Sequence, residues 1–200
     1  MAQYPTRKIR KRRTPRPLNA AGLEELALAY AARFATSAAK LEAYLQRKLR
    51  ERGWEGRDEG EDPPDTRELV DRFAAKGYVD DESYARMRAG DLVRRGYGPR
   101  RVGQALHQAG IDERLRDEMV PGARKQREAA MALARKRRFG PYASETPPQR
   151  EDARKQFEKQ LAAMVRAGHD FGTARFVLEA RSEAELEQWL AEAAEEDRDA

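Results

Sequence analysis

The sequence predicts an all-α protein in which three tandem three-helix repeats form an elongated, curved array. Three observations support this prediction. Ala, Leu, Arg, Glu and Gln, which favour helices, dominate the 200 residues, and runs of alternating Val, Ile and Thr are absent. Glycines stand where amphipathic segments end. Three of them, Gly53, Gly110 and Gly168, are spaced 57 and 58 residues apart, which leaves room for three helices in each interval.

Five glycines mark the expected ends of helices. A glycine directly after a helix adopts the left-handed conformation, and the next residue then packs on the residue four positions before the glycine. Four of the five sites offer a pair of large apolar or aromatic residues for this contact, and the fifth offers Met164 with His169. The four pairs are Leu49 with Trp54, Phe73 with Tyr78, Leu92 with Tyr97, and Leu106 with Ile111.

The apolar spacing between these stops gives the expected helices in order. Ser37 is placed to cap one helix start, and Pro99 opens another at a position where its missing N–H costs nothing. Leu186, Trp189 and Leu190 keep helical spacing beyond the repeats, and they either dock a last short helix or offer a small partner surface. The nine expected helices are 22–34, 37–52 and 65–76, then 81–95, 99–109 and 112–120, then 123–138, 151–167 and 170–180.

Charge and composition divide the chain further. Residues 1–17 hold seven basic side chains and no acid, whereas residues 182–200 hold eight acids and one arginine. Like-charge blocks of this kind are typical of interaction tails. Two Pro- and Gly-bearing insertions, 55–66 and 139–150, are expected to be exposed loops. The expected divisions are a basic arm at 1–21, repeats at 22–78, 79–121 and 122–181, and an acidic tail at 182–200.

The stretch GYVDDESYAR raises the question of a catalytic or metal site, because Asp80 and Asp81 are adjacent carboxylates. A helix start explains both residues. Asp80 then takes the N-cap position and Asp81 the first turn, where acids face the positive end of the helix dipole. Val79 and Tyr84 fall at the positions of a hydrophobic staple. Because no further ligands converge on the pair in the sequence, we predict a structural role.

Little else in the sequence indicates catalysis. Cysteine is absent, which removes disulfides and thiolate ligands and is compatible with a cytoplasmic protein. We expect His107 to lie at the surface or half-buried on a helix, and His169 to lie in a turn. No phosphate-binding glycine loop, nucleophile elbow or membrane-length apolar run is present. We therefore predict a protein that is not an enzyme, with no cofactor, no metal and no membrane segment.

The basic residues are more informative. The stretch RRGYGPRR places arginines on both sides of a tight corner between two helices, and Pro99 starts the second helix. Outward-pointing N–H groups at that start would make an anion-binding corner. An ordinary solvated face is the alternative, and a second cluster, 135–138, is explained by the negative end of its own helix. The expected partner or DNA contacts are Arg94, Arg95, Tyr97, Arg100 and Arg101.

The central part of the chain resembles the RecX family of regulatory proteins that act on bacterial RecA. The resemblance rests on KGYVDDESYAR followed by RRGYGPRRVGQALHQAGI, and weaker similarity extends it to about residues 23–180. Lys40 and the insertion at 139–150 depart from the family pattern. The motif positions matched here, all expected to shape helical corners, are Gly77, Tyr78, Asp80, Asp81, Tyr84, Gly96, Gly98, Gly110 and Ile111.

The resemblance implies a non-enzymatic modulator that binds RecA filaments on single-stranded DNA, and we expect a cytoplasmic monomer. It implies that the protein mostly inhibits the recombinase, ATPase and co-protease activities of RecA, with contact to single-stranded DNA that is indirect or weak. The alternative is a stand-alone helical protein that binds DNA through the basic arm and the arginine corner. Groove reading by the helix expected at 112–120 is disfavoured, because that helix is acidic. A scaffold with no role at DNA is a third reading.

Overall fold

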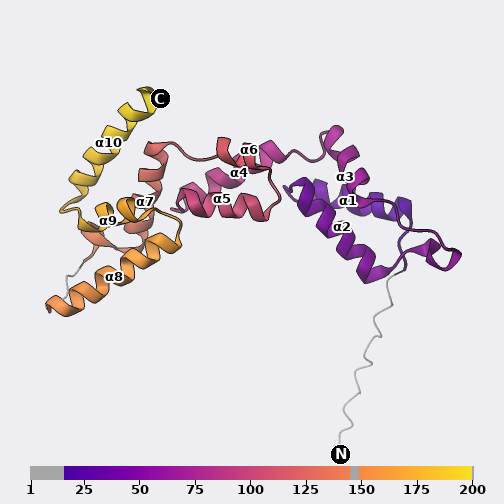
Figure 1. The fold of residues 1–200 in the computed structure, drawn as a ribbon, viewed down its shortest axis with the longest axis horizontal. Helices are drawn as coiled ribbons and strands as arrows, with labels where there is room; N and C mark the ends of the chain where they lie inside the picture. The colour runs from indigo at the N-terminus through magenta and orange to yellow at the C-terminus, as the bar shows by residue number, and fades with distance from the viewer. Residues whose placement is uncertain (1–15, 145–148, 200) are drawn as a thin grey trace, which may run out of the picture. The chain divides into compact units, whose positions relative to one another are not determined.

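The structure, a computed structural model, describes residues 16–144 and 149–199 (Figure 1). Within these ranges the chain is helical, and a single isolated bridge between Leu18 and Trp54 stands in place of a sheet. The predicted all-α class is confirmed. None of the described helices is long and apolar enough to cross a membrane. Most of the predicted basic arm lies outside the described residues.

Each helix that the spacing predicted is present, with ends within two residues of the expectation. The described residues form two compact units. The first combines the residues up to Phe34 with Leu41–Val79, and the second combines Ala35–Lys40 with the residues from Asp80 onward. The helices are α1 (Ala20–Arg33), α2 (Ala38–Arg52), α3 (Thr66–Ala75), α4 (Asp81–Arg94), α5 (Pro99–Gln108), α6 (Glu113–Glu118), α7 (Ala123–Arg137), α8 (Arg150–Arg166), α9 (Phe171–Glu179) and α10 (Glu183–Asp199), with short 3-10 helices η1 (Glu55–Glu59) and η2 (Gly140–Tyr142).

The first unit is built from α1 to α3 and the segment that enters α1. Leu18 is buried, and its backbone pairs with that of the chain after α2: the Leu18 N–H donates to the Gly53 carbonyl at 2.9 Å, and the Glu55 N–H donates to the Leu18 carbonyl at 2.8 Å. The Asn19 side chain caps α1. Packed structure therefore begins within the range that the sequence assigned to the basic arm.

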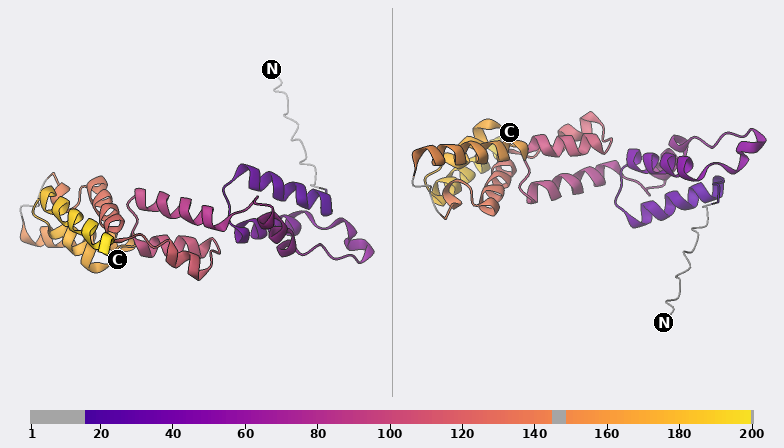
Figure 2. Two further views of the ribbon diagram at one scale, coloured as in Figure 1. Left: turned by 90° about the horizontal axis from the view of Figure 1, so that it is seen from above. Right: turned by 90° about the horizontal axis from the view of Figure 1, so that it is seen from below.

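The second unit contains α4 to α10, and α4 lies against α5 in all three views (Figures 1 and 2). The acidic C-terminal segment forms a long helix here, α10, which packs along α7. Leu186 is fully buried, and the centre of the Trp189 ring lies 4.7 Å from that of the Phe176 ring and 4.8 Å from the Arg127 guanidinium. Of the two expectations for this segment, docking on the protein body is the one observed.

The glycine stops have the backbone conformation that the sequence predicted. All five glycines have positive φ angles, from 73° at Gly110 to 98° at Gly168. At four of them the following N–H donates to the carbonyl five residues earlier, as Tyr78 does to Phe73 at 3.0 Å. Arg138 ends α7 with a φ of 56°; the helix end was predicted at this position, but the left-handed conformation was not, because arginine seldom adopts it.

The two insertions differ from simple exposed loops. Residues 55–66 include η1, and Asp65 caps α3 by accepting a hydrogen bond from the Arg67 N–H. Phe139 and Tyr142 pack against the core formed by α7, α8 and α9. The described residues of the second insertion are thus less exposed than the sequence predicted. Residues 145–148 of this insertion lie outside the described ranges.

Candidate functional site

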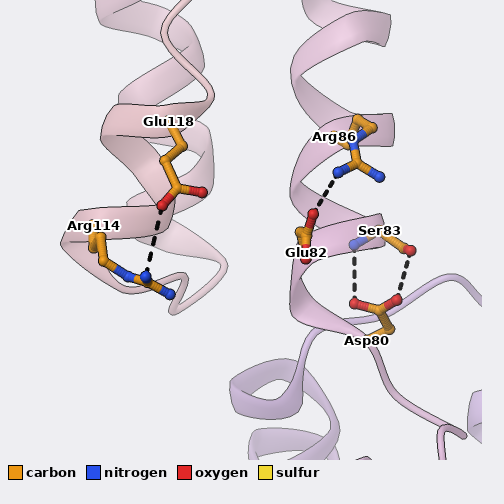
Figure 3. Close-up of polar contacts among 6 residues, drawn as sticks. All are labelled: Asp80, Glu82, Ser83, Arg86, Arg114 and Glu118. Carbon is orange, nitrogen blue, oxygen red and sulfur yellow. Dashed lines mark hydrogen bonds and ion pairs between the residues drawn. The ribbon is translucent and has the colours of Figure 1, made fainter.

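Asp80 lies at the N-cap of α4 and shows no sign of catalytic use (Figure 3). Its carboxylate accepts hydrogen bonds from the Ser83 N–H at 3.0 Å and the Ser83 hydroxyl at 2.6 Å. These bonds, with the side-chain bond from Ser83 as the largest contribution, lower the pKa of Asp80 below its usual value. Glu82 in the same turn pairs with Arg86. The carboxylate is therefore ionised, exposed and occupied by its own helix start.

Asp81 does more than occupy the first turn of α4. Its Oδ1 atom accepts a hydrogen bond of 2.8 Å from the Ala38 N–H, at the first residue of α2. The Ser37 hydroxyl donates to the Ala109 carbonyl at the end of α5. We call this contact between Ala35–Lys40 and the helices α4 and α5 the Ser37 seam. Ser37 was expected only as a helix cap, so its partner at Ala109 is a finding of the structure.

The remaining motif residues of this seam serve packing. Tyr84 is buried, and its hydroxyl bonds to the Lys40 ammonium. Lys40, which departs from the family pattern, thus has a partner in the fold. At Gly110 a Cβ atom would lie 2.2 Å from the Cβ of Ala39, so close packing excludes any side chain there. Ile111 is buried in the core of α4, α5 and α6.

The arginine corner is the stretch RRGYGPRR, residues 94–101. At its N-terminal end, three guanidinium groups surround one carboxylate. Asp91 lies 3.2 Å from Arg95, 3.7 Å from Arg88 and 3.8 Å from Arg94. All three arginines are more than a third exposed, so these ion pairs are weak and solvent-screened. One carboxylate cannot neutralise three cations, and the group keeps positive charge at the surface.

The prediction of an anion site at the backbone of the corner is wrong. The Gly98 N–H donates to the Ala167 carbonyl at 3.0 Å, and the Arg100 N–H donates to the Gly168 carbonyl at 3.2 Å. The start of α5 therefore faces the end of α8 instead of solvent. Nothing in the sequence indicated this pairing, because about 70 residues separate the two segments.

Glycine makes this contact possible. A Cβ atom at Gly98 would lie 2.4 Å from the carbonyl carbon of Gly168, and one at Gly168 would lie 2.4 Å from the backbone nitrogen of Arg101. We call this backbone-to-backbone contact the His169 seam, after the residue that follows Gly168. Tyr97 packs against the cores on both sides of it, which limits its use as a binding residue.

His169 lies between α8 and α9, as predicted for a turn residue, but it is almost fully buried in this seam, which was not predicted. Its Nε2 atom lies 3.0 Å from the Gly96 carbonyl oxygen, and its Nδ1 atom has no hydrogen-bond partner within the described residues. Burial lowers the pKa of His169 below the usual value of 6.5, against a smaller raising effect of the Gly96 carbonyl. The imidazole is therefore neutral at physiological pH. His107 lies exposed on α5, as expected.

No group of three or more histidine or carboxylate side chains suited to a metal ion occurs within residues 16–144 and 149–199. Charged side chains gather at helix caps, in ion pairs within helices, in the pair between Arg135 on α7 and Glu183 on α10, and at the arginine corner. The chemical property that this surface offers is positive charge, which can bind anionic groups. Arg94, Arg95, Arg100 and Arg101 are all exposed at the corner, and their role in binding a partner stays a prediction.

Comparison with known proteins identifies the family. The curated protein "Regulatory protein RecX" of Myxococcus xanthus is 33% identical over 177 residues, which cover 86% of this chain and 92% of that protein. The chain belongs to the RecX family. A curated RecX of Thermus thermophilus is 36% identical over 112 residues, 56% of this chain and 71% of its own length. Residues 80–120 match the family description "RecX, second three-helix domain".

The fold agrees with this assignment. The crystal structure of RecX from Lactobacillus salivarius superposes with a TM-score of 0.58, covering 80% of this chain and 94% of that one, at 16% sequence identity. The RecX match at residues 80–120 begins at Asp80 and includes the arginine corner and the whole of α5. The sequence resemblance to the family is thus confirmed, and the relatives are named as regulatory proteins.

Proposed function

We propose that this protein is a non-enzymatic regulator that binds RecA filaments on single-stranded DNA and mostly restrains RecA recombinase, ATPase and co-protease activity. The observation that carries the proposal is the similarity to "Regulatory protein RecX" along nearly the whole chain. The carboxylates of Asp80 and Asp81 and the imidazole of His169 add support, because a helix cap and the two seams already engage them.

The tandem repeats suggest a physical mechanism by which the protein would inhibit RecA. We keep the division into a basic arm, three repeats and an acidic tail as part of the proposal, with boundaries at 21/22, 78/79, 121/122 and 181/182. Repeats in tandem present several modest contacts to a polymer, and contacts made together gain avidity from their linkage. A protein that holds more than one protomer of a filament restricts their relative rotation, and filament growth and ATP turnover slow as a result.

The arginine corner is the surface that we assign to this contact. Arg94, Arg95, Arg100 and Arg101 are exposed, whereas Tyr97 contributes to packing as well. Reversing the four arginines to glutamate is expected to weaken binding to the filament and leave helicity intact. Because the ion pairs that Arg94 and Arg95 make within the described residues are exposed, screened pairs with Asp91, their loss costs the fold little.

Co-sedimentation with RecA–ssDNA filaments tests the proposal, with RecA-free single-stranded DNA as the control. We expect the wild-type protein to pellet with the filament and the four-arginine variant to remain in the supernatant, both with the same circular dichroism spectrum. Equal recovery of the wild-type protein with and without RecA would show that RecA is not the partner.

A stand-alone nucleic-acid-binding protein is the second candidate. The charge excess at Asp91, where three arginines surround one acid, favours it. In that case the chain would bind naked DNA strongly, and the affinity would fall steeply with salt.

A further inference from the structure

The outer face of α5 has no function in the fold. The inner face buries Val102 and Leu106 completely or nearly so. Positions 100, 103, 104 and 107 share the opposite face, because they are spaced by three, four and seven residues. Arg100, Gln104 and His107 are exposed there, and Gly103 is half-buried among them.

The charge of α5 runs against the stability of the helix. Among the α-helices of the described residues, α5 is the one that contains no aspartate or glutamate. It places Arg100 and Arg101 in its first turn, where the helix dipole disfavours cations. Arg101 bonds to Gln104 on the same helix, and Arg100 makes no ion pair within residues 16–144 and 149–199. Some exposed arginines elsewhere pair within their own helix, as Arg154 pairs with Glu158.

Gly103 breaks a second rule of helix stability. Glycine in the interior of a helix is unfavourable, because it loses more conformational freedom than alanine on folding. Apart from its chain neighbours and the backbone of its own helix, no described atom lies within 4 Å of the place that a Cβ at Gly103 would occupy, so packing against other parts of the described protein does not require a glycine. A missing side chain on an open helix face permits the close approach of another molecule.

The positive charge of α5 and the interior glycine Gly103 lie on one face, and together they indicate one class of partner. Departures from local stability rules without compensation inside the fold are expected where a protein binds something. None of the large exposed apolar side chains belongs to α5, so the face lacks the anchors that a protein partner would bury. A cation without an ion pair, an amide and an imidazole beside an open backbone suit a chain of phosphates.

We propose that the outer face of α5, formed by Arg100, Gly103, Gln104 and His107, binds the phosphodiester backbone of nucleic acid. Gly103 lets the backbone of the nucleic acid approach the helix, and Arg100 neutralises a phosphate. Arg100 also belongs to the arginine corner that we assign to the filament, and this proposal deepens the second candidate function, since the contact requires no RecA.

The test measures binding of a fluorescein-labelled oligothymidylate to the full chain by anisotropy across a salt series. Gly103→Ala is expected to raise the melting temperature and weaken binding about threefold, and Gly103→Gln to weaken it about tenfold, because each side chain holds the phosphates away from α5. Arg100→Gln is expected to reduce the slope of log affinity against log salt by about 0.7, the value for one phosphate of a single strand. A duplex of the same length distinguishes single-stranded from double-stranded ligands.

Two matched variants serve as controls. Gly90→Ala changes the interior glycine of α4, where a Cβ would meet only the end of the Arg94 side chain, and it should stabilise the fold without weakening binding. Arg154→Gln removes an exposed charge from α8 and should leave the salt slope unchanged. If the Gly103 variants and Arg100→Gln bind the oligonucleotide as the wild type does, the proposal is overturned.

The same variants separate this proposal from the proposed function. Retention of oligonucleotide affinity with loss of filament co-sedimentation would show that α5 contacts protein, which also overturns the nucleic-acid assignment. Loss of oligonucleotide affinity in the α5 variants supports the assignment even if the wild-type protein never pellets with RecA.

Discussion

The two seams of the second unit hold together by different chemistry. In the Ser37 seam, side chains bridge the gap: a hydroxyl bonds to the Ala109 carbonyl and the Asp81 carboxylate accepts from a helix start. In the His169 seam the two backbones touch directly through Gly98 and Gly168, and the enclosed imidazole is neutral. The polar bonds of the Ser37 seam can adapt to a small change, except at Gly110, where Ala39 leaves no room for an added carbon, whereas the backbone contact of the His169 seam leaves no room at either glycine.

Gly98→Ala should have the largest effect, because it adds a Cβ at a place where backbone atoms lie 2.4 Å away. The φ of −78° at Gly98 suits alanine, so any loss of stability reports the clash and not backbone strain. We expect the free energy of unfolding in urea to fall by about 3 kcal/mol, the upper range for overpacking.

Gly53→Ala is the matched control for that substitution. Gly53 has a φ of 80° and nothing within 4 Å of its Cβ position, so only the left-handed strain of about 1 kcal/mol applies. Equal losses in the two variants would contradict the close contact at the His169 seam.

Ser37→Ala tests the other seam. The substitution leaves the Ala109 carbonyl, in a fully buried residue, without its side-chain donor, and we expect a loss of about 2 kcal/mol in the free energy of unfolding. Ser83→Ala, which removes an exposed hydroxyl that bonds to Asp80, should cost about 0.5 kcal/mol or less. A Ser37 variant as stable as the Ser83 variant would mean that the Ser37 seam contributes nothing.

The His169 seam should also weaken in acid. The pKa of His169 is lowered in the folded state, so the unfolded chain binds a proton first as the pH falls through about 6.5. Stability is then lost on going from about pH 7.5 to about pH 5.5, by at most about 1.4 kcal/mol per pH unit for one proton. His169→Gln should remove this dependence, and His107→Gln, at an exposed position, should retain it.

Asp81→Ala should have the smallest effect of the set. It removes the acceptor for the Ala38 N–H and a favourable charge at a helix start, for an expected loss of about 1 kcal/mol. Glu82 is a suitable comparison, since its carboxylate contacts only the exposed Arg86 on its own helix. If Glu82→Ala lowered the free energy of unfolding as much as Asp81→Ala does, the hydrogen bond between Asp81 and Ala38 would not contribute to stability beyond the charge at the helix start.

Local features of the fold were predictable from the sequence, and contacts across the seams were not. Asp80 as a cap and the glycine stops each depend on a few neighbouring residues, so their spacing was informative. The burial of His169 and the pairing of Gly98 with Gly168 depend on segments about 70 residues apart, for which one sequence carries no signal. The anion-binding site at the corner was mispredicted for that reason. The N–H groups were correctly placed at the start of α5, but the sequence did not show that carbonyl groups at the end of α8 accept their hydrogen bonds.

The candidate site follows the same division. The arginines at both ends of the corner were identified from the stretch RRGYGPRR, and the structure leaves them exposed. Tyr97 looked equivalent in the sequence, yet it packs between two cores. Gly103 was overlooked because its meaning depends on empty space around it, which only the structure reveals.

The proposed regulation of RecA is tested most directly by the ATPase rate of RecA on single-stranded DNA, measured with increasing amounts of this protein. We predict that the rate falls when the protein is still substoichiometric to RecA, and that reversing Arg94, Arg95, Arg100 and Arg101 to glutamate relieves the inhibition. A rate that stays constant at every ratio would contradict the proposed function.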